Sequence, residues 1–274
     1  MTSIATRQSR APRGTTAPTI DWPVKYDLFG VRVTASDYGQ IVDVVLRTAK
    51  ERVSAVVSLH AAHAIVESTR DPELLAKVNR FEAVLPDGQP VRWALNRLHG
   101  LAIRERVYGP ELMLRLCSRA ADDDLPIYLY GSTPNVLELL QLKLLALFPG
   151  LHIAGAESPP FRALTPEEDA AVVRRINDSG AGIVFIGLGC PKQDHFAADH
   201  ADRFRAVQVC VGAAFDFHAG TQPMAPEWMQ RRGLEWLYRL TQEPRRLWRR
   251  YLHTNLIFLG KWLAASMRRK NDAE

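Results

Sequence analysis

The chain has 274 residues, 47% hydrophobic and 24% charged, the composition of an ordinary globular protein with room for one large domain. Its three cysteines, Cys117, Cys190 and Cys210, form no CxxC pair, which argues against a disulfide framework or a zinc knuckle and favours a reduced, cytoplasmic protein. The net charge is +5, but the segment from Trp228 to Lys270 holds eleven Arg and Lys against two acids, so the basic character belongs to the C-terminal tail.

The first residues are rich in Thr, Ala, Pro and Arg and show no hydrophobic periodicity. We expect residues 1–25 to form a disordered arm, and the lack of an apolar run there argues against a secretory signal. The most apolar window, 256–265, is too short to span a bilayer and contains Lys261, so we expect no transmembrane helix. The chain then divides into this arm, an α/β domain over 26–222 and a basic, aromatic helical appendage over 223–274.

From residue 53 onward, short apolar runs alternate with longer helical segments. The predicted strands are 53–60, 82–88, 126–131, 151–156, 181–189 and 206–217. The predicted helices are 61–79, 110–124, 132–150, 165–180 and 191–204. This alternation predicts an α/β fold, with a Rossmann-like, mostly parallel sheet covered by helices on both faces. Ligands of such sheets bind at the carboxyl ends of the strands, and this rule sorts the candidate residues.

Two aspartates are predicted at that edge. Asp87, in LPDGQP, directly follows a short apolar run. Pro-Asp-Gly is also an ordinary turn sequence, so Asp87 is either a turn residue or a carboxylate placed to act as a general base. Asp216, in AAFDFHAG, lies between two phenylalanines at the end of the last predicted strand. A buried aspartate needs a partner, and either a ribose hydroxyl or a protein donor would serve.

Two glycine-containing segments lie where predicted strands lead into helices. GLGCPKQD (187–194) begins like a dinucleotide fingerprint, but a lysine replaces the third glycine and the GK[ST] of a P-loop is missing. Free N–H groups at such a helix start suit a phosphate or a nucleotide edge, the alternative being a tight βα turn. GSTPN (131–135) offers a second helix start with the same ambiguity. The candidate binding residues from these segments are Gly131, Gly187, Gly189, Lys192 and Gln193.

The acidic and histidine clusters do not predict a metal site. Asp122–Asp124 contain a DxD, the metal-holding pattern of many sugar-nucleotide enzymes, but the triplet ends a helix at the amino edge of the sheet, where a solvated helix end is expected. His60 with His63, and His195 with His200, lack a third ligand at a familiar spacing. We therefore expect neither a metal nor another cofactor.

The tail from Arg245 onward separates into two faces at helical spacing. Basic residues occupy one face: Arg246, Arg249, Arg250 and His253. Aromatic and apolar residues occupy the other: Trp248, Tyr251, Leu252, Leu256, Leu259, Trp262 and Leu263. This pattern is typical of a helix on an anionic bilayer surface. One alternative is a helix docked on the protein core. Another is nucleic-acid binding, which the slightly acidic remainder of the chain disfavours.

The motifs, taken together and in order, resemble the WecG/TagA/CpsF family of bacterial glycosyltransferases. The resemblance covers roughly residues 30–255 and rests on LPDG, RVYGPEL, YGSTPNV, FPGLHIAG, GLGCPKQD, GAAFDFHAG and the long string APEWMQ…GLEWLYRL…EPRRLWRRYL. Members act on undecaprenyl-diphosphate-linked sugars during the synthesis of cell-surface polysaccharides. The resemblance therefore implies an inverting transfer from a UDP-sugar to a polyprenyl-diphosphate-linked acceptor, by an enzyme attached to the inner face of the cytoplasmic membrane.

The resemblance also implies roles for individual residues. The family's general base corresponds to Asp87, and a candidate for the leaving diphosphate is Arg106. Gln193 and Asp216 match positions that line the nucleotide pocket. The appendage is expected to attach the enzyme to the membrane and to bring arginines to the active site, the candidates being Arg239, Arg246 and Arg249. Catalysis of this kind does not require a metal held by a DxD.

One segment departs from the family pattern. Relatives commonly show Thr-x-Asn where this chain has Ser58, Leu59 and His60. Ser58 can replace a threonine hydroxyl, whereas His60 changes hydrogen bonding and charge at a position expected to contact the donor. This change disfavours the N-acetylmannosamine donor of well-known relatives, and a glucose or uronic-acid donor for an exopolysaccharide is at least as well supported; the sequence does not decide between them.

From the residues alone, two other functions stay open. A nicotinamide-dependent dehydrogenase is one, although the incomplete GxGxxG disfavours it. The other is a non-enzymatic adaptor for membranes or nucleic acids. The sequence leaves the oligomeric state open, with a homo-oligomer among the alternatives.

Overall fold

A computed structural model describes residues 20–271, so most of the expected arm, residues 1–19, and the last residues, 272–274, lie outside the described part. Residues 20–25, the part of the expected arm that the structure describes, are not disordered. Ile20 and Trp22 pack against the hydrophobic core, and the backbone N–H of Ala35 donates to the carbonyl of Val24. The ordered structure therefore begins before residue 25, where the sequence predicted disorder.

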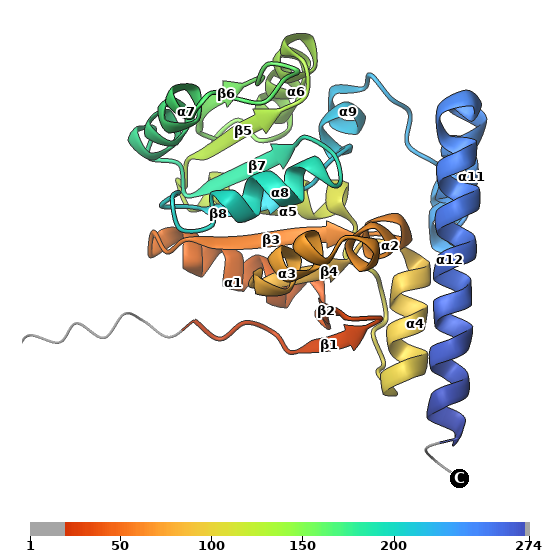
Figure 1. Cartoon of the computed structure of the whole chain (residues 1–274). Coiled ribbons are helices and arrows are strands. Elements are labelled where there is room, and N and C mark those ends of the chain that lie inside the picture. The colour runs from red at the N-terminus through yellow and green to blue at the C-terminus, as the bar shows by residue number, and fades with distance from the viewer. Residues whose placement is uncertain (1–19, 272–274) are drawn as a thin grey trace, which may run out of the picture.

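The core of the fold is a six-stranded sheet in which every pair of neighbouring strands is parallel. Its order is β4-β3-β8-β7-β5-β6 (Figure 1). The strands are β3 (Ala55–His60), β4 (Ala83–Pro86), β5 (Ile127–Gly131), β6 (Ile153–Glu157), β7 (Ile183–Gly187) and β8 (Val207–Cys210). This arrangement confirms the predicted α/β, Rossmann-like fold.

Helices cover both faces of the sheet, as predicted. One face carries α1 (Tyr38–Lys50), α5 (Gly109–Asp122), α6 (Pro134–Leu147) and α9 (Ala214–Ala219). The other carries α2 (Ala62–Arg70), α3 (Pro72–Arg80), α4 (Gln89–His99), α7 (Pro166–Asp178) and α8 (Lys192–Asp199). Successive strand residues supply the two cores in turn: Phe185 faces the first, and Val184 and Ile186 face the second. A sheet buried on both faces leaves only its ends for a ligand.

Two predicted elements differ in the structure. The single helix expected over 61–79 is two helices, because Asp71 accepts hydrogen bonds from the N–H groups of Glu73 and Leu74 and starts α3 at Pro72. The strand expected over 206–217 ends at Cys210. Gly212 then turns the chain with a positive φ of 54°, and Asp216 lies on α9 rather than at a strand end.

Three segments fold into elements that the sequence pattern did not reveal. Two are α1 and α4, and the third is an antiparallel hairpin of β1 (Lys25–Leu28) and β2 (Val31–Thr34). The hairpin lies beside edge strand β4, where the Val84 N–H donates to the Thr34 hydroxyl over 3.1 Å. One edge of the main sheet is thereby covered.

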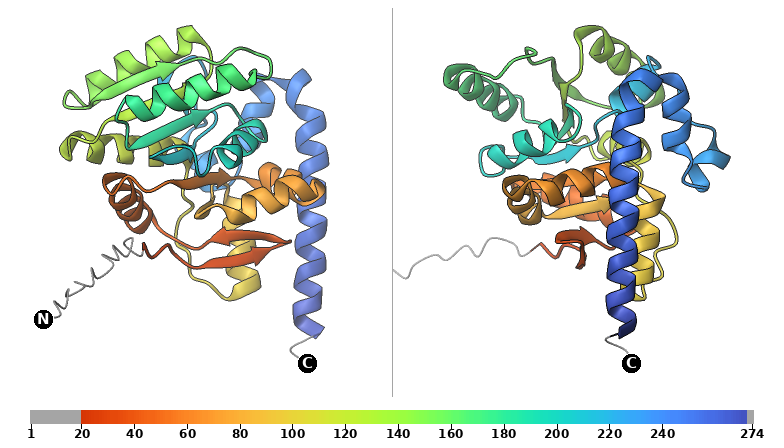
Figure 2. Two further views of the ribbon diagram at one scale, coloured as in Figure 1. Left: turned by 60° about the vertical axis from the view of Figure 1, so that its left-hand side comes forward. Right: turned by 45° about the vertical axis from the view of Figure 1, so that its right-hand side comes forward.

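The C-terminal appendage forms α10 (Glu227–Arg231), α11 (Glu235–Gln242) and α12 (Pro244–Asn271). The long helix α12 runs across the edge to which the strands point, as Figures 1 and 2 show from three sides. Its inner face is buried through Leu247, Tyr251 and Phe258, and it contacts α2, α4 and α11. The appendage is therefore part of the packed fold, so the docked-helix alternative holds for this face.

A second face of α12 carries a row of exposed apolar residues: Trp248, Leu252, Leu256, Leu259, Leu263 and Met267. The sequence pattern placed Tyr251 and Trp262 on this same face, but both turn toward the protein. The helix thus has two apolar faces, one docked on the protein and one exposed. Within residues 20–271 no helix is both long enough and apolar enough to cross a bilayer.

The docked face of α12 should contribute to stability. Phe258 is 3% exposed and meets Phe29 edge-on, with 5.4 Å between ring centroids. We expect Phe258→Ala to lower the free energy of unfolding by about 3 kcal/mol, because it removes a buried aromatic ring. The matched change Leu256→Ala, on the exposed face of the same helix, should stay within about 0.5 kcal/mol of the parent. Urea unfolding measures both, and equal effects would contradict the docking.

Candidate active site

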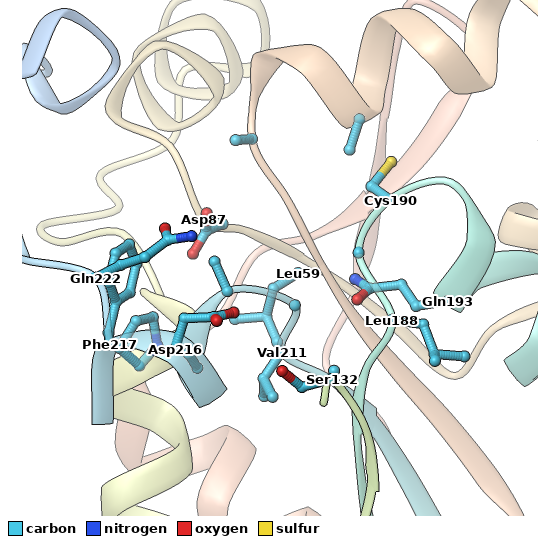
Figure 3. A pocket seen from close by; sticks show the side chains of 18 of the residues that line it. Leu59, Asp87, Ser132, Leu188, Cys190, Gln193, Val211, Asp216, Phe217 and Gln222 are labelled. Carbon is cyan, nitrogen blue, oxygen red and sulfur yellow. The ribbon is translucent and has the colours of Figure 1, made fainter. Parts of the chain in front are cut away.

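A large cavity of about 490 Å³ opens at the carboxyl ends of the strands. Segments that follow β3, β4, β5, β7 and β8 line it, together with α9 and α11, as expected for this type of sheet. Figure 3 shows Asp87, Asp216, Phe217 and Gln222 at one end of this cavity and Leu188, Cys190 and Gln193 at the other. Of the predicted site residues, it brings together Asp87, Gly187, Gly189, Gln193, Asp216 and Arg239.

Two of the predicted glycines are required by close packing at this edge. A Cβ atom on Gly131 would lie 2.6 Å from the carbonyl of Gly187, so the ends of β5 and β7 approach more closely than side chains allow. A Cβ on Gly187 would lie 2.6 Å from the ring of Phe215. Gly187 lines the cavity, whereas Gly131 supports the wall without lining it.

Gln193 offers an unsatisfied polar group to the large cavity. It lies in the first turn of α8 and is 3% exposed. Among the described residues, its Oε1 atom has no hydrogen-bond partner. A buried amide without a partner is costly, so this atom is suited to a donor group of a ligand. The adjacent Lys192 is exposed and lies outside the cavity lining, so the structure does not bring it to the site.

Ser58 and His60 form a buried network behind the cavity instead of lining it. Asp194 Oδ1 accepts a hydrogen bond from Ser58 Oγ at 2.6 Å and lies 3.3 Å from His60 Nε2. Burial favours the neutral form of Asp194, but His60 and Ser58 outweigh it and hold the carboxyl pKa below its usual value. In this structure, therefore, neither Ser58 nor His60 reaches the cavity wall, and the expectation about the donor sugar stays a prediction. The network anchors the residue next to Gln193.

Asp87 lies at the end of β4 and is held by the backbone. Its Oδ1 accepts a hydrogen bond from the Gly109 N–H at 2.8 Å, and its own N–H donates to the His60 carbonyl. Burial raises the pKa of Asp87, and the nearby Glu235 carboxylate raises it further, while Arg106 and Arg239 oppose the shift. A raised pKa makes the ionised carboxylate a stronger proton acceptor, which suits a general base.

Arg106, Tyr108 and Glu235 form a connected group beside Asp87. The Arg106 Nη2 donates to Glu235 Oε2 at 2.8 Å, and the Tyr108 hydroxyl donates to Glu235 Oε1 at 3.0 Å. The guanidinium lies 4.1 Å from the centre of the Tyr108 ring. Burial opposes the charge of Arg106, but the carboxylates of Glu235 and Asp87 outweigh it and hold the pKa above its usual value. Sequence reasoning missed Tyr108 and Glu235, although both lie inside the motif strings.

A small cavity of about 110 Å³ adjoins the large one, and Asp87 belongs to the lining of both. Ala61, His63, Glu235 and Arg239 are shared in the same way. The small cavity is closed by the starts of α2 and α4 on one side and by α11 and α12 on the other. His63, which the sequence had considered only as a metal ligand, is therefore a wall residue of both cavities.

Of the three arginines assigned to the site from the appendage, the structure places Arg239 there. It lines both cavities, and its guanidinium lies 5.7 Å from the centre of the Phe217 ring. Arg249 is exposed on α12, over the ring of Trp248, and lines neither cavity. The side chain of Arg246 lies outside the described residues.

The residues considered as metal ligands are dispersed. Asp123 forms an ion pair with Lys50 at 2.9 Å, at the amino edge of the sheet. His200 pairs with Asp169 at 2.9 Å, away from the cavity lining. Within the described part of the chain, no three His, Cys, Asp or Glu side chains are close enough together to hold a metal ion.

The raised pKa of Asp87 predicts a pH-dependent cost in stability. Because the folded state binds this proton more tightly than the unfolded state, the stability from Asp87 is complete below the ordinary carboxyl pKa and is lost as pH rises through the raised value. We expect Asp87→Asn to gain stability relative to the parent as pH rises from about 4 to about 9, by about 1.4 kcal/mol for every tenfold difference in proton affinity between the folded and unfolded states. Melting temperatures across this range test it. Asp43→Asn, at an exposed carboxylate on α1, is the control, and a pH-independent difference for Asp87→Asn would contradict the assignment.

Comparison with known families agrees with this geometry. The model of the glycosyl transferase WecG/TagA/CpsF family matches residues 26–272, which is nearly the whole chain and includes the appendage. Both cavities, Asp87 and the Arg106–Glu235 pair lie inside the matched region. The chain therefore belongs to the WecG/TagA/CpsF family of glycosyltransferases.

Proposed function

We propose that this glycosyltransferase moves a sugar, with inversion, from a UDP-sugar to a polyprenyl-diphosphate-linked saccharide, of which undecaprenyl diphosphate is the expected carrier. The observation that carries the proposal is one cavity with a free buried amide oxygen at Gln193 and a carboxylate of raised pKa at Asp87. The Gln193 oxygen is suited to the imide N–H of uracil. With uracil at Gln193, the sugar of the donor would lie toward Asp87, at the other end of the cavity.

In the proposed reaction, Asp87 removes the proton from an acceptor hydroxyl as its oxygen attacks the anomeric carbon of the donor. The bond from that carbon to the diphosphate oxygen breaks, and its electron pair leaves with UDP. Attack opposite the leaving group inverts the anomeric centre. Asp87 ends the step protonated, and it returns the proton to water after the products leave.

Positive groups around Asp87 are suited to the charge that develops on the leaving diphosphate. Arg239 reaches both cavities, and Arg106 is buried at the wall of the small one. Fixed cations in a site with little water stabilise a developing anion without reorganising solvent. We propose that these groups take the place of a metal ion in this enzyme.

The exposed face of α12 supports a peripheral position on the inner leaflet of the membrane. Its apolar row lies next to the exposed Arg245 and Arg249. Apolar side chains enter the headgroup boundary, and each arginine near anionic lipids contributes about 1 kcal/mol. A lipid-linked acceptor used in cell-surface polysaccharide synthesis would be presented at that surface.

The role of Asp87 is tested by binding and turnover measured separately. We expect Asp87→Asn to bind UDP about as tightly as the parent, while the transfer rate falls by about 10² to 10⁴, the usual contribution of a general base. Titration calorimetry with UDP, with and without EDTA, gives the binding, and release of UDP from UDP-sugars gives the rate. Retained turnover would remove the base assignment. A parent protein that binds no UDP would remove the proposed donor.

The membrane role is tested without deleting the appendage, because deletion would expose the core under Phe258. We expect the combined change of Leu252, Leu256 and Leu259 to Ser to lower binding to anionic vesicles at least tenfold, since three side chains no longer enter the lipid. The control changes Leu142, Leu145 and Leu147 to Ser, three exposed leucines on α6. Vesicle co-sedimentation measures both, and equal binding by the two variants would contradict the docking face.

A further inference from the structure

The small cavity has features that the donor does not explain. Asp87 belongs to its lining but Gln193 does not, and residues of α11 and α12 in the appendage form part of its wall. At about 110 Å³ it falls below the range of about 300 to 1,000 Å³ that is usual for pockets of larger ligands. A nucleotide-sugar is therefore too large for it, while the large cavity lies within that range.

The lining of the small cavity combines an aromatic surface with hydrogen-bonding groups. Trp236 of α11 and Tyr251 of α12 meet with ring centroids 6.1 Å apart, inclined by 64°. Gln89 and Asn255 add amide side chains from α4 and α12. An apolar wall with a few placed polar groups is the usual character of a site for a neutral small molecule, and a sugar ring presents one C–H face and a rim of hydroxyls.

The two helix starts at this cavity add backbone donors. Helices α2 and α4 both begin at its wall, at Ala61 and Gly88, and neither has a side-chain cap or an acid in its first turn. The first N–H groups of α2 and the N–H of Gln89 therefore lack a side-chain acceptor from the cap position, whereas Pro90, the second residue of α4, has no N–H to offer. Together with the amide groups and with Arg106 and Arg239, they surround the space next to Asp87 with donors.

The position of the small cavity also fits the chemistry of inversion. The attacking oxygen must approach the anomeric carbon from the side opposite the leaving diphosphate. The general base must lie within hydrogen-bond distance of that acceptor oxygen. Asp87 is in the lining of both cavities, so a hydroxyl in the small cavity can reach it while the donor fills the large one.

Finally, α12 relates this cavity to the membrane-facing row. Asn255 lines the cavity, while the neighbouring Leu252, Leu256 and Leu259 are exposed. A helix is about 10 Å in diameter, so a sugar held at Asn255 lies within one helix width of the exposed row. A saccharide can thus be held in the cavity while its lipid chain stays in the bilayer.

From these observations we infer that the small cavity is the acceptor subsite and binds the single sugar ring whose hydroxyl is glycosylated, with Trp236 as its stacking surface and Asn255 and Gln89 as hydrogen-bonding residues. The inference rests on the proposed function. It assigns donor recognition to the strand ends and the start of α8, and acceptor recognition to α11 and α12 of the appendage together with Gln89 of α4.

The test compares Trp236→Leu and Asn255→Ala with the parent in detergent, using as acceptors a panel of farnesyl-diphosphate-linked monosaccharides. We expect the KM for the acceptor to rise about tenfold or more in each variant, while the KM for the UDP-sugar and the Kd for UDP stay within about twofold. The control is Trp228→Leu, at an exposed tryptophan of α10 that lines neither cavity, and it should change neither KM.

Each remaining outcome has a defined meaning. A variant with a raised KM for the UDP-sugar and an unchanged KM for the acceptor would overturn the inference. So would a parent protein that uses no acceptor of the panel and, when loaded with UDP, shows no saturation-transfer NMR signal from any of them. If Trp236→Leu does not fold, Asn255→Ala on the partly exposed face of α12 decides alone. Failure to bind UDP in the parent would instead overturn the proposed function, and calorimetry detects it independently of any acceptor.

Discussion

Glu235 joins the C-terminal appendage to the α/β domain through two hydrogen bonds, one from Arg106 and one from Tyr108. The ion pair with Arg106 is largely buried, so each charge depends on the other, and loss of one partner would leave an uncompensated charge inside the protein. This contact holds α11 against the site and places a second carboxylate near Asp87. The shape of both cavities and the proton affinity of Asp87 therefore depend on the appendage, although Asp87 itself follows a strand of the sheet.

The residues that line the cavities come from two parts of the chain, the segments at the strand ends and the appendage. Strand ends supply Asp87 and Gly187, and the first turn of α8 supplies Gln193; a sheet that is buried on both faces fixes the strand ends. The appendage supplies Glu235 and Arg239 from α11, which α12 holds in place by docking across the same edge. A family match that continues to residue 272 is consistent with an appendage that belongs to the active enzyme.

Sequence reasoning predicted the features that depend on local pattern. The parallel sheet followed from the alternation of apolar strands and helices, and Asp87 followed from its position after a strand. The sequence pattern did not predict which side chains of a buried strand point toward the cavity. Ser58 and His60 lie next to Leu59 on a strand buried on both sides, and their motif position does not tell which residue reaches the cavity. Likewise, α12 is apolar on two faces, so periodicity alone could not separate the docked residues from the exposed row. Glu235 and Tyr108 needed the tertiary contact to be recognised.

The buried Ser58–Asp194–His60 network has an effect on the entropy of binding. Because Asp194 is fixed by two partners, the first turn of α8 and the adjoining Gln193 are ordered by folding, before any nucleotide is present. The rotational freedom that a surface glutamine would lose on binding a ligand, about 1 kcal/mol or more, has already been given up here. The Gln193 side chain thus belongs to a preorganised part of the cavity wall, which Ser58 and His60 support through Asp194 without lining the cavity themselves.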